Sequence, residues 1–116
     1  MERILGIGGY FLRAQDPTAL TTWYRDNLGL DADALWRQEP GVTVFAAFEG
    51  DTEYFGPGRQ GAMINFRVRD LDAMLAQLRG NGADVEEGTQ DVEGIGRFGW
   101  VTDPEGNRVE LWEAVS

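Results

Sequence analysis

Several residue types with characteristic chemistry are missing from this chain. It contains no cysteine, histidine or lysine, and its only serine is the final residue, Ser116. The absence of cysteine excludes disulfides and thiolate metal sites and is typical of a reducing compartment, so we expect a cytoplasmic protein. Schiff-base lysines, cysteine nucleophiles, serine–histidine pairs and histidine bases are excluded as well. Proton transfer is therefore left to carboxylates and to Tyr10, Tyr24 or Tyr54.

Long apolar runs and positive charge are also scarce. No run approaches the roughly 18 residues that span a bilayer, and no basic region followed by an apolar stretch begins the chain. Ten arginines stand against 20 acidic residues, which gives a net charge of −10. Such a charge repels phosphates and anionic lipids, so we expect neither nucleic acid nor membrane as a partner. We interpret the acidic segment 84–93 as a solvated surface.

One pattern occurs twice along the chain. Residues 9–16 precede an amphipathic helix that ends near Gly29, and residues 63–70 precede a similar helix that ends near Gly82. A chain of 116 residues has the length of one domain. We therefore expect a single domain over residues 1–116. Its parts are module one at 1–55, a Gly/Pro-rich linker at 56–61, and module two at 62–116.

Local signals predict the same order of elements in both modules. Asp16 and Asp70 are helix caps, and Pro17 occupies a first helical position, where its missing N–H does no harm. The strands predicted for module one cover residues 4–14, 34–38, 42–49 and 52–55. Those predicted for module two cover residues 62–68, a weakly marked segment near 85–90, 97–102 and 108–113, with a turn at 103–107. The sequence thus predicts an α+β fold made of two tandem βαβββ modules.

Alternation along the strands predicts one apolar and one mixed face. In the last strand Val109 and Leu111 share a face, whereas Arg108, Glu110 and Trp112 share the other. A face of mixed polar and aromatic residues suits a ligand better than a core. The candidate ligand-binding residues on mixed faces are Phe11, Arg13, Asn65, Arg67, Trp100, Arg108 and Trp112. Glu110 is the candidate catalytic residue, as a general base.

Three motifs carry a family resemblance. They are residues 23–30 at the end of the first helix, residues 66–72 before the second, and Asp103-Pro-Glu-Gly-Asn-Arg-Val-Glu-Leu-Trp112. With these motifs, the paired modules resemble the vicinal oxygen chelate superfamily of glyoxalases, extradiol dioxygenases and bleomycin-resistance proteins. The resemblance implies mixed sheets that curl into a shared cup, with helices outside and ligand inside. It also implies a homodimer, formed either by a cup across the interface or by module swapping through the linker.

The resemblance also locates the positions where metal-using members carry their ligands. These members commonly have His or Gln in each first strand and Glu in each last strand. The corresponding first-strand positions here are Gly9 and Met63, whereas Glu110 and Glu53 stand for the last-strand carboxylates. Glycine has no side chain, and the methionine sulfur is a soft ligand. We therefore expect no metal site and no cofactor.

Three functions remain open at this point. The first is a small-molecule binder without the family metal site, which sequesters or senses an organic ligand, of the cationic kind that bleomycin-type members bind. The second is a metal-independent isomerase or lyase with Glu110 as base, and the third is a divergent enzyme resembling lactoylglutathione lyase. Glu110 also has a purely structural interpretation, as the ion-pair partner of Arg13, Arg67 or Arg108.

Overall fold

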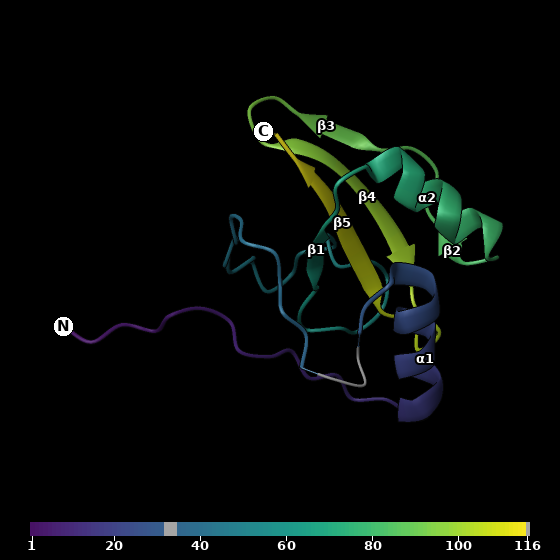
Figure 1. The fold of residues 1–116 in the computed structure, drawn as a ribbon, viewed down its shortest axis with the longest axis horizontal. Coiled ribbons are helices and arrows are strands. Elements are labelled where there is room, and N and C mark those ends of the chain that lie inside the picture. The colour runs from purple at the N-terminus through teal and green to yellow at the C-terminus, as the bar shows by residue number, and fades with distance from the viewer. Residues whose placement is uncertain (32–34, 116) are drawn as a thin grey trace.

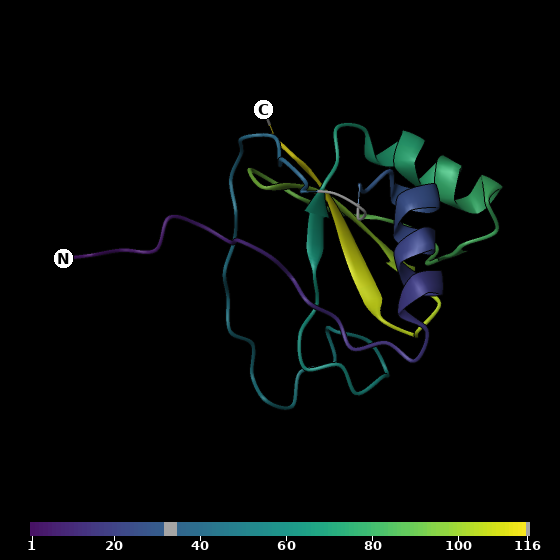
Figure 2. The ribbon, with the colours of Figure 1, turned by 60° about the horizontal axis from the view of Figure 1, so that its bottom comes forward.

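The sheet of this α+β fold is mixed, and both helices lie on one side of it (Figures 1 and 2). The computed structural model describes residues 1–31 and 35–115. Its elements are α1 (Pro17–Leu28), β1 (Asn65–Arg67), α2 (Leu71–Gly80), β2 (Asp84–Val85), β3 (Gln90–Val92), β4 (Gly96–Thr102) and β5 (Arg108–Ala114). The strand order is β1-β5-β4-β2, with β3 also paired to β4. Strand β1 runs parallel to β5, and the other pairs are antiparallel.

Both helices begin and end close to the positions that the sequence predicts. The Asp16 side chain accepts a 3.0 Å hydrogen bond from the Ala19 N–H, and Asp70 caps α2 in the same way. Gly29 ends α1 in the left-handed conformation at φ 69°. The predicted caps and helices are therefore confirmed.

The core lies between the helices and one face of the sheet. Its buried residues are Leu20, Tyr24, Leu71, Leu75, Leu78, Val101, Val109 and Leu111. Gly99 lets α2 approach β4 closely, because a Cβ atom there would lie 3.2 Å from the Leu75 side chain. Since Val109 and Leu111 both face this core, the predicted parity of the last strand is confirmed.

The predicted turn at 103–107 fastens α1 to the sheet. The Asp103 carboxylate accepts hydrogen bonds from the backbone N–H groups of Glu105 and Asn107, at 2.9 and 3.0 Å. It also accepts one from the Tyr24 hydroxyl at 2.7 Å. The Glu105 carboxylate in turn accepts from the backbone N–H groups of Gln15 and Asp16, at 3.0 and 3.1 Å. Asp103 and Glu105, which belong to the sequence motif at 103–112, therefore have a structural role.

Module two forms a strand, a helix and then four strands, because two short strands, β2 and β3, stand where one was predicted near 85–90; module one does not form its predicted strands. Among the described residues before Asn65, α1 is the only helix and no strand is formed. The strands predicted over 4–14, 42–49 and 52–55 are wrong for the isolated chain, as is the described part of 34–38; residue 34 lies outside the described residues. The N-terminal end instead runs away from the sheet as extended chain (Figures 1 and 2), whereas Tyr10 lies close enough to Asp103 that burial and, after it, the Asp103 carboxylate raise its pKa. A strand needs a neighbour for its backbone groups, and none of the described residues pairs as a strand with these segments.

None of the helices in the described ranges is long and apolar enough to cross a membrane.

Candidate functional site

The register of three strands brings the predicted mixed-face residues into rows. Asn65 on β1, Glu110 on β5 and Trp100 on β4 lie side by side in one row. Arg67, Trp112 and Phe98 form the next row. We call these six residues, with Arg108 beside them on β5, the aromatic face. It is the side of the sheet turned away from α1 and α2, because the alternate residues Val109 and Leu111 contact the helices.

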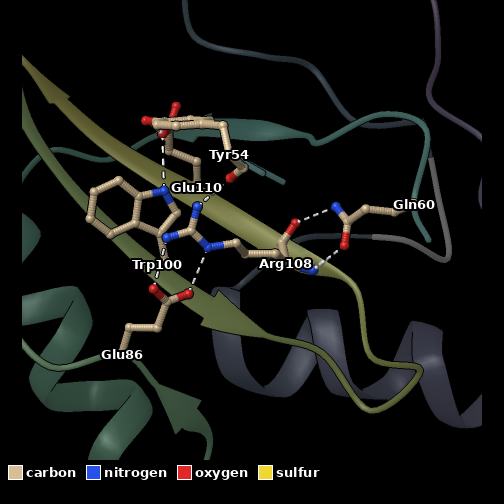
Figure 3. Close-up of polar contacts among 6 residues, drawn as sticks. All are labelled: Tyr54, Gln60, Glu86, Trp100, Arg108 and Glu110. Atoms are coloured by element: carbon tan, nitrogen blue, oxygen red, sulfur yellow. Dashed lines mark hydrogen bonds and ion pairs between the residues drawn. The ribbon is translucent and has the colours of Figure 1, made fainter. Parts of the chain in front are cut away.

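Glu110 lies at the centre of the aromatic face and is 7% exposed. Its Oε1 accepts a 2.7 Å hydrogen bond from Asn65 Nδ2. Its Oε2 accepts two, from Trp100 Nε1 at 3.0 Å and from the Tyr54 hydroxyl at 2.5 Å (Figure 3). Three donors directed at two oxygens suit a carboxylate. Glu110 forms no ion pair with any residue that the structure describes.

Arg108 is held by a different acid. Its Nε and Nη2 each donate a 2.7 Å hydrogen bond to the Glu86 carboxylate (Figure 3). Its guanidinium carbon stands 4.7 Å from the centre of the Trp100 ring, and Nη1 donates to the Tyr54 carbonyl. The hydrogen bond from Arg108 holds the pKa of Glu86 below its ordinary value. Arg108 therefore does not pair with Glu110, and Glu86 is part of the site rather than of a solvated segment.

The second row has its own partners. Trp112 stacks on Phe98 with ring centres 5.8 Å apart, and its Nε1 donates a 3.1 Å hydrogen bond to the Ile95 carbonyl. Arg67 turns toward the segment before β1 and donates a 2.7 Å hydrogen bond to the Glu39 carbonyl. Neither Trp112 nor Arg67 hydrogen-bonds to Glu110.

The structure thus brings together some of the predicted site residues and separates others. Asn65, Trp100, Arg108 and Glu110 form one cluster, and Arg67 and Trp112 flank it. Phe11 is 94% exposed, and Arg13 is exposed on the same N-terminal segment, so neither reaches the cluster in this chain. Their inclusion depended on the strand predicted over 4–14, which is not formed.

Tyr54, Glu86 and Gln60 complete the cluster, although none was a predicted ligand-binding residue. Gln60 clamps the Arg108 backbone with two hydrogen bonds, of 2.7 Å from the N–H and 3.0 Å to the carbonyl. Tyr54 was predicted only as one of three tyrosines able to transfer a proton. Burial raises the pKa of its phenol well above the ordinary value, and the hydrogen bond to Glu110 adds to this.

These residues do not fit the metal of the wider superfamily. Both Glu110 oxygens face N–H or O–H donors, and such donors occupy the directions in which a metal ion would bind. Gly9 offers no side chain, and Met63 offers only a thioether. In the part of the chain that the structure describes, no three His, Cys, Asp or Glu residues are grouped to hold a metal ion.

A cavity of about 350 Å³ lies next to the core, between β1 and the two helices. Its lining includes Leu28, Trp36, Phe66, Met74 and Gln77, and of the aromatic face it contains only Arg67. Its charged lining residues are Arg67, Arg69 and Asp70, none of which is buried. We locate the candidate site at Glu110, because a buried carboxylate is the stronger determinant of ligand chemistry.

Solved structures share this fold. TnmS3, an antibiotic-binding protein from Streptomyces sp. CB03234, is 23% identical, with a TM-score of 0.67 over 99% of this chain and 100% of that chain. A lactoylglutathione lyase from Agrobacterium tumefaciens is 20% identical, with a TM-score of 0.62 over 97% and 96%. A glyoxalase/bleomycin resistance protein/dioxygenase superfamily member from Sphaerobacter thermophilus DSM 20745 is 19% identical, with a TM-score of 0.61 over 95% and 98%. No curated protein matches the chain.

The family assignment rests on the amino-acid sequence. The sequence model of the glyoxalase-like domain family matches residues 10–112, which is most of the chain. The resemblance to the vicinal oxygen chelate superfamily is thereby confirmed, and the protein belongs to the glyoxalase-like domain family.

Proposed function

We propose that this protein binds a small organic cation at Glu110 without the help of a metal ion. The observation that supports this most is the buried carboxylate, which is solvated by three neutral donors and has no ion-pair partner among the described residues. A ligand cation placed beside it would gain an ion pair in a water-poor environment. The stacked rings of Trp112 and Phe98 in the next row offer apolar contacts beside it.

The local charge balance favours a cation over an anion. Glu86 pairs with Arg108 through a bidentate contact, so Glu86, Arg108 and Glu110 together leave the cluster with a net negative charge. The net charge of −10 adds a long-range attraction for cations. TnmS3, which shares the fold, is described as an antibiotic-binding protein, and this agrees with small-molecule binding on such a scaffold.

Benzamidine and benzamide test this proposal as a matched pair, because both are planar and only benzamidine is cationic. Isothermal titration calorimetry should show benzamidine binding to the wild type, with benzamide at least about tenfold weaker. Glu110→Gln should lose most of the benzamidine affinity, whereas Glu93→Gln, which makes the same charge change at an exposed position, should keep it. Equal affinity for the two compounds, or an unaffected Glu110→Gln variant, would rule out cation binding at this site.

The Tyr54–Glu110 hydrogen bond also favours a second function, a metal-independent isomerase or lyase. A carboxylate base next to a phenol of raised pKa is an arrangement able to move protons. Turnover of a bound compound that is lost in Glu110→Gln, while binding persists, would identify the enzyme. Saturable binding without turnover would identify the binder.

We propose further that the working form is a homodimer in which module one completes the sheet. Ile64 and Val68 use their backbone groups to pair with β5, so the backbone groups of Asn65 and Arg67 face an edge that no described residue pairs. The N-terminal segment carries Ile4, Leu5 and Phe11, each more than 90% exposed. A second copy that adds residues 4–14 as a strand would satisfy both features. Sedimentation equilibrium at micromolar concentration should give twice the chain mass of 12.9 kDa, and a monomer mass would refute the dimer.

A further inference from the structure

Tyr54 occupies a place at Glu110 where a ligand would donate its hydrogen bond. Its hydroxyl lies 2.5 Å from Glu110 Oε2, on the oxygen that Trp100 also contacts (Figure 3). We infer that this hydroxyl is a built-in competitor, which a ligand must displace and which sets the affinity threshold of the site. The inference rests on the proposed function, namely that cations bind at Glu110.

Among the three donors to Glu110, Tyr54 is the one that does not belong to the sheet. Asn65 and Trp100 belong to β1 and β4, and Trp100 is 8% exposed with Arg108 over its ring. Tyr54 belongs to the irregular segment before the linker, and its side chain is only half-buried. A rotation of the Tyr54 side chain therefore removes one of the two donors to Oε2, whereas Asn65, an exposed residue of β1, donates to the other oxygen.

The backbone around Tyr54 is held independently of its hydroxyl. Arg108 Nη1 donates to the Tyr54 carbonyl, and Gln60 bonds both to the N–H and to the carbonyl of Arg108. These anchors fix the segment over β5. The Tyr54 ring lies with its centre 5.6 Å from the Arg108 guanidinium carbon and 6.4 Å from the centre of the Trp100 ring. The ring is stacked on Phe48 with centres 5.4 Å apart, and Phe48 is itself 49% exposed. Displacement is therefore a side-chain event, with the segment remaining in place.

The competitor also sets which cations are accepted. A ligand that carries N–H donors replaces the hydrogen bond it displaces, so its exchange with Tyr54 is nearly balanced. A quaternary ammonium has no N–H, and it would leave Glu110 with one donor fewer than in the free protein. The expected ligand is therefore an amine, amidinium or guanidinium, and quaternary cations are rejected.

Tyr54→Phe tests this directly, because it keeps the ring and removes only the hydroxyl. The probes are benzamidine, which has N–H donors, and benzyltrimethylammonium, which has none. In the wild type, benzamidine should bind at least about tenfold more tightly than the quaternary probe. In Tyr54→Phe, both affinities should rise by about ten- to hundredfold, because neither probe then has a hydroxyl to displace. Tyr10→Phe, at a tyrosine 44% exposed and outside the cluster, is the matched control and should change neither.

The possible outcomes separate the inference from the function on which it rests. If benzamidine binds in a Glu110-dependent way but Tyr54→Phe leaves its affinity unchanged or weaker, the competitor role is wrong and cation binding stands. If benzamidine binds neither protein, or binds without regard to Glu110→Gln, both proposals are wrong. Circular dichroism and the indole NMR signal of Trp100 report whether the Tyr54→Phe site is still assembled. A disordered Trp100 signal would mean that the hydroxyl supports the fold, and this also contradicts a free competitor.

Discussion

The hydroxyl of Tyr24 donates a 2.7 Å hydrogen bond to Asp103 Oδ2 across 79 positions of the chain. Tyr24 belongs to α1 and is 5% exposed, whereas Asp103 begins the turn between β4 and β5 and is 4% exposed. This contact joins the only helix of module one to the sheet of module two, within the described residues. The turn motif shared with the wider family therefore fastens the two halves together, next to the strand that carries Glu110.

We expect Tyr24→Phe to destabilise the fold. The variant keeps the ring in the core and removes one donor from a buried carboxylate, which retains the N–H donors of Glu105 and Asn107. A hydrogen bond to a charged group contributes about 1.5–3 kcal/mol, so the free energy of unfolding should fall by about that amount. Urea denaturation at neutral pH measures it. A Tyr24→Phe variant as stable as the wild type would show that the bond is energetically neutral.

The same residue predicts a loss of stability in alkali. Burial raises the pKa of Tyr24 far above its ordinary value of 10.0, and the hydrogen bond and charge of Asp103 raise it further. In the unfolded chain the phenol ionises near pH 10, whereas in the folded protein it stays neutral. The stabilisation is therefore complete below pH 10 and is lost progressively as the pH rises above it.

Urea denaturation between about pH 8 and about pH 11 should show this decline. In Tyr24→Phe the decline should be shallower. It should not vanish, because the pKa values of Tyr54 and Tyr10 are raised as well. Parallel declines in wild type and variant would mean that Tyr24 ionises normally in the folded state.

The elements that could be predicted from sequence are those whose signals are local. Asp16, Pro17 and Gly29 delimit α1 within a few residues, and the turn residues at 103–107 delimit the last hairpin. Strand parity placed Asn65 and Glu110 on mixed faces, because alternation fixes which side chains of one strand share a face. Trp100 was a candidate as an aromatic residue able to stack on a ligand, and the register of β4 with β5 places it beside Glu110.

Contacts that depend on distant pairing could not be predicted. Residues 4–14 are of types that favour a strand. Whether they form one depends on a neighbouring strand, which the local sequence does not identify. Tyr54 and Glu86 reach the site from an irregular segment and from beyond a two-residue strand, where no periodicity marks a side chain's direction. The aromatic face was therefore predictable, whereas the groups that cover it were not.

Gly96 should be irreplaceable at the start of β4. Its φ is +143°, and a Cβ atom there would lie 2.2 Å from the Glu113 carbonyl and 2.7 Å from Trp112 Nε1. Gly96→Ala should therefore lower the free energy of unfolding by about 2–5 kcal/mol and displace the Trp112 ring. Gly94→Ala is the matched control, because Gly94 also has a positive φ, of +77°, but nothing within 4 Å of its Cβ position. The control should lose only about 1–2 kcal/mol. Equal losses in the two variants, measured by urea denaturation, would contradict the close contact at Gly96.

Glu86→Gln should affect both the stability of the protein in acid and its affinity for a cationic ligand. The hydrogen bond from Arg108 lowers the pKa of Glu86 below its ordinary value of 4.5, so the stabilisation is present above that value and is lost as the pH falls through the folded-state pKa. Because the Glu86 side chain is 38% exposed and therefore screened, the loss at pH 7 should be at most about 1 kcal/mol, and the two proteins should converge in acid.

The same substitution frees the Arg108 charge beside Glu110, so benzamidine should bind more weakly to Glu86→Gln at pH 7 than to the wild type. Asp84→Asn, at an exposed acid on β2, is the control for the general loss of negative charge. Calorimetry distinguishes the two explanations. A selective loss of affinity in Glu86→Gln means that Glu86 keeps the site anionic by holding Arg108, whereas equal losses in both variants mean that the cation responds only to the overall charge of the protein.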